Sequence, residues 1–161
     1  MYRWLFIHDM KAIICFDGSA PSKTALKFAM KLDPVLEKLY VLYVKPTIIG
    51  SGASFESYVP ATVYEKQDET AESIISQARA MVGDGVSNVE FLSADAGGEP
   101  VSFIVVKTAK EKGADFVITG TRKLGGLSKV ILGSVSSDII KMSEIPVLVC
   151  PEDKSEEETK S

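Results

Sequence analysis

The chain has 161 residues, 45% of them hydrophobic and 25% charged, which is the composition of one ordinary globular domain and excludes a disordered or fibrous protein. Its net charge is -4, but the last eleven residues, PEDKSEEETKS, hold five acids and two lysines, so 17 acids and 16 bases remain in the body. This near balance gives no broad positive field, so we expect no nucleic acid as a partner. We expect the acidic tail, residues 152–161, to be disordered and solvated.

Apolar runs of strand length alternate with segments of helical periodicity, and turn residues separate them. In chain order the sequence predicts a strand over 11–16, a helix over 21–32, a strand over 39–44, a loop over 45–60, a helix over 62–82, a strand over 89–94, a helix over 101–112, a strand over 115–119, a helix over 134–142 and a strand over 145–150. This alternation predicts an α/β protein with one parallel sheet, covered by helices on both faces.

Two further features predict a cytoplasmic protein. Cys15 and Cys150 both stand in apolar runs, which is typical of buried thiols in a reducing compartment and not of a disulfide framework or a zinc cluster. The N-terminal residues MYRWLFIHD are too short and too aromatic for a signal peptide, and no apolar run approaches the length of a membrane span. We therefore expect no membrane partner.

The segment ITGTRKLGGLSKVILGSVSSDII, residues 118–140, combines glycines, cations and the start of a helix. Main chain can approach a phosphate only where side chains are absent, and the amides of a helix start attract anions. This composition predicts an anionic ligand, most simply a nucleotide, although a turn with a solvated basic face is the alternative interpretation. Neither a P-loop nor a G-x-G-x-x-G motif is present. The residues in question are Gly120, Gly125, Gly126 and Gly133, then Arg122, Lys123 and Lys129, and finally Ser134, Val135 and Ser136.

Together with IICFDGS (13–19), LYVLYV (39–44) and IPVLVC (145–150), this segment resembles the universal stress protein family over residues 10–151, with residues 1–9 as an N-terminal extension. The resemblance implies a five-stranded, Rossmann-like sheet of order 3-2-1-4-5, related to the adenine nucleotide alpha hydrolases. Ligands of such sheets bind beyond the carboxyl ends of the strands where the order reverses, here between the first and fourth strands. The resemblance also implies a homodimer through the fifth strand, Pro146 to Cys150, an edge strand that is open to pairing.

Family members that bind ATP carry the pattern G-x2-G-x9-G-(S/T), which Gly120 and the pair Gly133-Ser134 match at its two ends. Lys123 replaces the second glycine, where its side chain either crowds the phosphates or neutralises them. The resemblance assigns Asp17 to the ribose and the backbone of Val44 to the adenine. The complete predicted site for ATP or AMP, with Mg²⁺ carried by the phosphates, comprises Cys15, Asp17, Val44, Thr119, Gly120, Arg122, Lys123, Gly133, Ser134, Val135 and Ser136.

Other functions have less support in the sequence. A receiver-type phosphoacceptor site needs clustered acids, but only Asp17 follows the first strand, with Asp95 beyond the third. His8 is the only histidine and lies outside the β/α pattern, so a hydrolytic triad would lack its base. Ser134 and Ser136 are equally well interpreted as helix caps. We expect a nucleotide-binding and stress-signalling module with at most slow ATP hydrolysis. The alternative is a family member that has lost nucleotide binding through Lys123 and acts as a dimeric interaction module.

Overall fold

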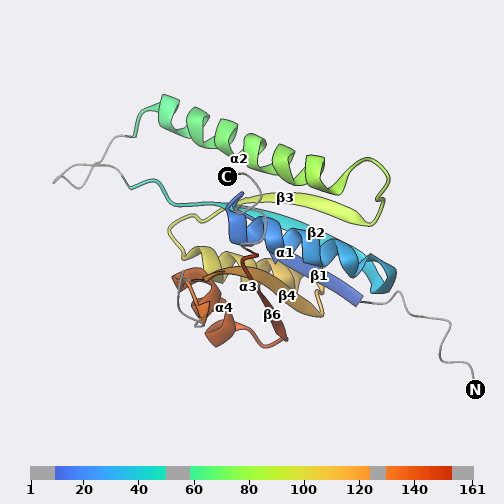
Figure 1. Ribbon diagram of the computed structural model, residues 1–161. Coiled ribbons are helices and arrows are strands. Elements are labelled where there is room, and N and C mark those ends of the chain that lie inside the picture. Colours follow the sequence, from blue (N-terminus) through green and yellow to red (C-terminus); the bar gives the residue numbers. More distant parts are fainter. Residues whose placement is uncertain (1–9, 50–58, 124–129, 154–161) are drawn as a thin grey trace, which may run out of the picture.

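The computed structural model describes residues 10–49, 59–123 and 130–153. The predicted extension (1–9), part of the long loop (50–58), Gly125, Gly126 and Lys129 in the glycine segment, and the acidic tail from 154 onward lie outside these ranges. The elements, drawn in Figure 1, are β1 Met10–Cys15, α1 Ala20–Lys31, the 3-10 turn η2 Asp33–Val35, β2 Leu36–Lys45, α2 Ala61–Val82, β3 Val89–Asp95, α3 Val101–Lys112, β4 Phe116–Lys123, β5 Val130–Ile131, α4 Ser134–Met142 and β6 Val147–Pro151.

The sheet confirms the predicted topology. Its parallel strands follow the order β3-β2-β1-β4-β6, in which β6 is the predicted fifth strand. β4 extends past its predicted end at Thr119, because it pairs with β6 as far as Thr121 and then antiparallel with β5. The two-residue β5 was not predicted, since so short a strand leaves no alternation pattern in the sequence.

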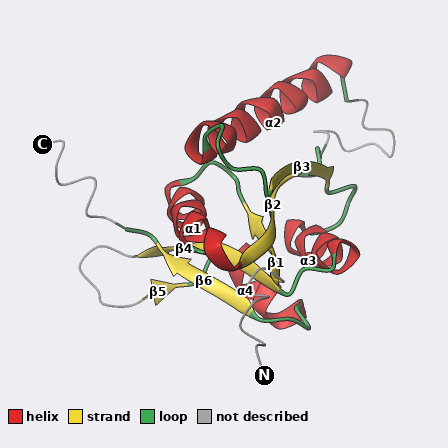
Figure 2. Ribbon diagram, turned by 90° about the vertical axis from the view of Figure 1, so that its right-hand side faces the viewer, coloured by secondary structure: helices red, strands yellow, loops and turns green. Residues whose placement is uncertain are grey.

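Helices cover both faces of the sheet, as Figure 2 shows, with α1 and α2 on one face and α3 and α4 on the other. Successive side chains of a strand point to opposite faces, so β1 contributes Ala12 and Ile14 to the first core and Ile13 to the second. All three side chains are fully buried, which explains why the strand appears in the sequence as an unbroken apolar run. Within the described ranges, no helix is both long enough and apolar enough to cross a bilayer.

Candidate functional site

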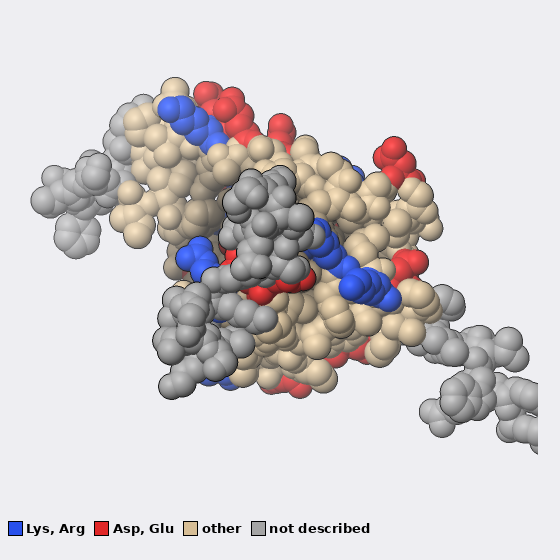
Figure 3. Space-filling model, in the orientation of Figure 1, with Lys and Arg blue, Asp and Glu red and all other residues tan. Residues whose placement is uncertain are grey.

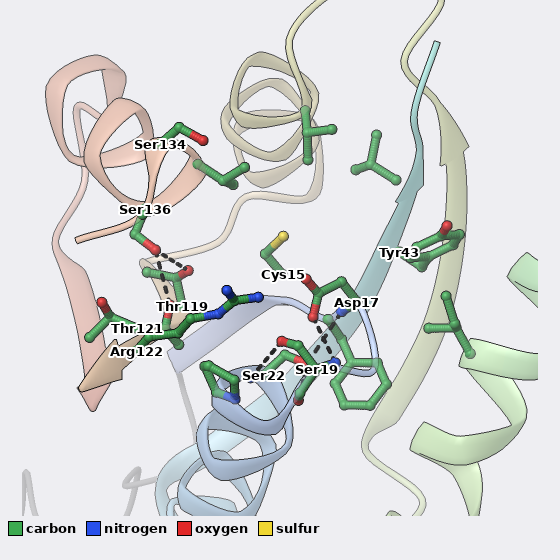
Figure 4. A pocket seen from close by; sticks show the side chains of 18 of the residues that line it. Cys15, Asp17, Ser19, Ser22, Tyr43, Thr119, Thr121, Arg122, Ser134 and Ser136 are labelled. Atoms are coloured by element: carbon green, nitrogen blue, oxygen red, sulfur yellow. Dashed lines mark hydrogen bonds between the residues drawn. The ribbon is translucent and has the colours of Figure 1, made fainter. Parts of the chain in front are cut away.

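A cavity of about 620 Å³ opens at the carboxyl edge of the sheet, beyond the ends of β1, β2 and β4 (Figure 4). Its volume lies within the range of about 300–1,000 Å³ that is usual for cofactor sites. Every predicted site residue except Lys123 lies on its wall, and the side chain of Lys123 is outside the described part of the structure. The first turns of α1 and α4 face each other across the cavity.

Asp17 follows β1 and is held by the start of α1. Its Oδ1 accepts a hydrogen bond of 2.9 Å from the amide of Ser19, which is also the N-cap of α1. The hydroxyl of Ser22 accepts from the Asp17 amide at 3.4 Å and donates to the Ser19 carbonyl at 3.0 Å. Desolvation by burial raises the pKa of Asp17, but the hydrogen bonds from Ser19 and Ser22 outweigh it and bring the pKa below its ordinary value of 3.8. Asp17 is therefore ionised at neutral pH.

The lowered pKa of Asp17 predicts a pH-dependent effect of the substitution Asp17→Asn. A carboxylate with a lowered pKa in the folded state stabilises the protein above its unfolded value of 3.8, and this contribution disappears as the pH falls through the folded value. The wild type should therefore be more stable than Asp17→Asn at pH 7, and the gap should shrink below about pH 4. Urea unfolding at several pH values measures the gap, and a gap that does not change with pH would contradict the assignment.

Gly120 has a structural role that the sequence interpretation did not anticipate. A Cβ atom at this position would lie 2.3 Å from the carbonyl carbon and oxygen of Pro21 and 2.8 Å from the amide nitrogen of Ser22. The absence of a side chain therefore lets the first turn of α1 pack directly on β4. We predicted that Gly120 lacks a side chain in order to admit phosphate. This reason needs correction, because the backbone of α1 occupies the position that a Cβ atom of residue 120 would take.

Gly133 is different. A Cβ atom there would meet no atom within 4 Å, and its φ of -68° is open to any residue, so neither packing nor backbone geometry requires glycine. Gly133 is the N-cap of α4 and has no side chain to cap the helix. The interpretation of Ser134 and Ser136 as helix caps was therefore wrong. The buried hydroxyl of Ser136 instead donates a hydrogen bond of 3.0 Å to the carbonyl of Gly120. It also lies 3.3 Å from the hydroxyl of Thr119, so these contacts join α4 to β4.

Val44 presents main-chain groups to the cavity. The carbonyl of Leu42 accepts from the amide of Phe16 at 2.9 Å, so alternate residues of β2 direct their backbone groups toward β1. The pairing of β1 with β2 ends at Cys15 and Leu42, and Val44 is the next residue of β2 that faces this side. Its N–H and C=O therefore point past the end of β1, into the space that the cavity occupies.

A sequence model of the universal stress protein family matches residues 10–151. The chain belongs to the universal stress protein family. The Bacillus subtilis universal stress protein YxiE is 30% identical to this universal stress protein over 146 residues, which are 86% of this chain and 97% of YxiE.

Solved structures of universal stress proteins share the fold. A family member from Burkholderia pseudomallei has a TM-score of 0.66 at 23% identity, over 88% of this chain and 95% of that one. The universal stress protein from Archaeoglobus fulgidus, solved in complex with dAMP, has a TM-score of 0.61 at 20% identity, over 88% of this chain and 97% of that one.

Several lining residues of this universal stress protein were missed by sequence reasoning. Ser19 is the last residue of the DGS turn and Ser22 lies in the first turn of α1, so the N-cap pattern at the start of α1 was a usable signal for them. No local signal marks Ile74 or Val101, because they reach the cavity only through the placement of α2 and α3 on the sheet. The complete set of missed residues is Phe16, Ser19, Pro21, Ser22, Tyr43, Pro46, Ile74, Val101 and Thr121.

Among the described lining residues, the cavity presents one thiol, that of Cys15, and one carboxylate, that of Asp17. Desolvation by burial, with a smaller effect of Asp17, raises the pKa of the Cys15 thiol to about 12, so it stays neutral and unreactive. Asp95 is not on the cavity wall: β2 separates β3 from β1, and the Asp95 carboxylate pairs with Lys45 at 3.0 Å. Among the described residues, no three His, Cys, Asp or Glu side chains gather as metal ligands.

Proposed function

We propose that this universal stress protein binds ATP or AMP in the cavity and works as a nucleotide-dependent stress-signalling module. The observation that carries the proposal is that a single cavity joins a cationic end, rich in backbone donors, to an apolar end that is open to main-chain hydrogen bonding. The dAMP complex of the Archaeoglobus fulgidus relative supports an adenine nucleotide as the ligand.

The polar end of the cavity suits phosphate. The amides of Ser134, Val135 and Ser136 are among the first of α4 and have no acceptor within the helix, so they carry the positive end of its dipole. Gly133 leaves open the space in front of them. Arg122, at the end of β4, extends its side chain across the cavity toward the Asp17 side (Figure 4) and would pair with phosphate oxygens.

The opposite end suits a purine. Tyr43, Ile74 and Val101 supply apolar surface from three different elements. The free backbone N–H and C=O of Val44 can serve one donor and one acceptor on the edge of a base, which gives orientation without a charged side chain. Asp17 lies between the two ends and, as an ionised acceptor, can receive the hydroxyl groups of a ribose.

Binding, and not rapid hydrolysis, is the activity that these groups support. Asp17 is the only carboxylate among the lining residues that the structure describes, and its lowered pKa makes it a weak general base. Mg²⁺ would arrive with the phosphates, to which Asp17 and the hydroxyls could add ligands. We propose at most slow ATP hydrolysis.

Lys123 motivates the alternative function, a dimeric interaction module without nucleotide. Its backbone pairs with Val130 in the antiparallel β4–β5 ladder, where the ATP-binding pattern of the family has a glycine. The variant Lys123→Gly discriminates the two proposals: ATP binding by this variant alone would favour the alternative.

We also propose a homodimer through Pro146 to Cys150, since within the described ranges β6 pairs only with β4. Sedimentation of the purified protein measures its oligomeric state.

The experiment for the proposed function is calorimetric titration of nucleotide-stripped protein with ATP, AMP and GTP. We expect saturable heat with both adenine nucleotides and weaker binding of GTP, because guanine has its O6 acceptor and N1–H donor where adenine has its N6 donor and N1 acceptor, which reverses the pattern that faces the N–H and C=O of Val44. No heat with ATP or AMP at millimolar concentration would refute the proposal.

A further inference from the structure

The exposed side of α1 carries a line of lysines. Lys23, Lys27 and Lys31 recur at every fourth residue and therefore share one face of the helix, and Figure 3 shows basic side chains on the surface over α1. Lys27 and Lys31 are exposed and Lys23 is half-buried, and α1 contains no acid. Like charges at this spacing repel, and Lys23 also lies near the positive end of the helix dipole, so this face of α1 attracts anionic groups.

The acidic end of the chain begins on the same helix. After β6 the Glu152 amide donates to the carbonyl of Thr121 at 2.8 Å, and the Asp153 amide donates to the hydroxyl of Thr24 at 3.4 Å. Thr24 lies one residue from Lys23. The chain is thus anchored on α1, beside the lysine line, at the point where residues 154–161 begin.

The reach of those residues matches the positions of the lysines. Glu156 to Glu158 follow Asp153 by three to five residues, which an extended chain converts to about 10–18 Å. Lys27 and Lys31 follow Thr24 by three and seven residues, or about 5 and 11 Å along a helix with a rise of 1.5 Å per residue. Glu156 to Glu158 can therefore reach Lys27 and Lys31 while the hydrogen bond between Asp153 and Thr24 is kept.

We propose that the line Lys23, Lys27 and Lys31 is an anion-binding surface whose occupant is the chain's own acidic tail, residues 154–161. The tail is tethered within a few residues of the surface, so its effective concentration there is millimolar, and exposed ion pairs, each of them weak, give partial docking in rapid exchange. Such docking is reversible and sensitive to salt. It is independent of whether a nucleotide occupies the cavity.

Amide NMR spectra of the full-length, ¹⁵N-labelled protein test this proposal. The triple variant Glu156→Gln, Glu157→Gln, Glu158→Gln should shift the amide signals of α1 between Lys23 and Lys31, because the anionic side chains leave that face. The difference between variant and wild type should disappear when NaCl is raised from about 0.01 M to about 1 M, since the screening length falls from about 30 Å to about 3 Å.

Matched lysine variants show which surface the tail uses. Lys27→Gln with Lys31→Gln should shift the tail signals toward their positions at high salt, whereas Lys107→Gln with Lys110→Gln, on the exposed side of α3, should leave them unchanged. Shifts confined to Arg122 and the start of α4 would place the tail in the cavity and overturn the proposal. The absence of any salt-dependent shift in α1 would equally overturn it, by showing a solvated tail.

Discussion

Among the glycines that the structure describes, replacement by alanine should destabilise the fold most at Gly120. The new Cβ would lie 2.3 Å from the carbonyl group of Pro21, which is backbone and cannot rotate away. Forced overpacking of this kind costs typically 1–3 kcal/mol, and we expect about 3 kcal/mol here. For a chain of this length the melting temperature should fall by about 6–12 °C.

Gly133→Ala is the matched control for this prediction, since its Cβ meets no atom within 4 Å. It should cost no more than about 1 kcal/mol, the difference between glycine and alanine at an N-cap. Urea unfolding of both variants measures the contrast. Equal stabilities would show that α1 does not pack on β4 as described.

Replacing Gly133 by valine should weaken nucleotide binding while the fold persists. The side chain would enter the open space in front of the first amides of α4, where we propose that phosphate oxygens lie. Losing one charge-assisted hydrogen bond costs about 1.5–3 kcal/mol, so ATP affinity should fall roughly 10- to 100-fold. Calorimetric titration with ATP and with adenosine measures the effect, and adenosine binding should change less.

Gly85→Val is the control for the Gly133 substitution. Gly85 lies in the turn after α2, its Cβ would also meet nothing within 4 Å, and it is not on the cavity wall. This variant should bind ATP as the wild type does. If Gly133→Val bound ATP equally well, the phosphates would have to lie elsewhere.

Sequence patterns were sufficient for the architecture. The alternation of apolar runs and helices predicted the parallel sheet, because strands that are buried on both faces leave unbroken apolar runs such as that of β1, while the strand order followed from the family resemblance. The same reasoning placed Asp17 and the start of α4 at one edge of the sheet, since the carboxyl ends of parallel strands share an edge.

The remaining features depend on contacts that have no local signature. The close approach of Pro21 to Gly120 comes from the way α1 lies on β4, and the glycine motif alone suggested a different reason for that glycine. The hydroxyl of Ser136 bonds across to β4 instead of capping its own helix, which required the position of β4 to be known. Ile74 reaches the cavity from a helix whose sequence shows only an amphipathic pattern.

The most direct test of the central claim is a crystal structure of the protein grown with ATP. We predict a nucleotide in the cavity of about 620 Å³, with its phosphates at the amides of Ser134 to Ser136 and its base edge on the backbone of Val44. A structure in which the side chain of Lys123 fills the phosphate end, or in which ATP binds away from this cavity, would contradict the account.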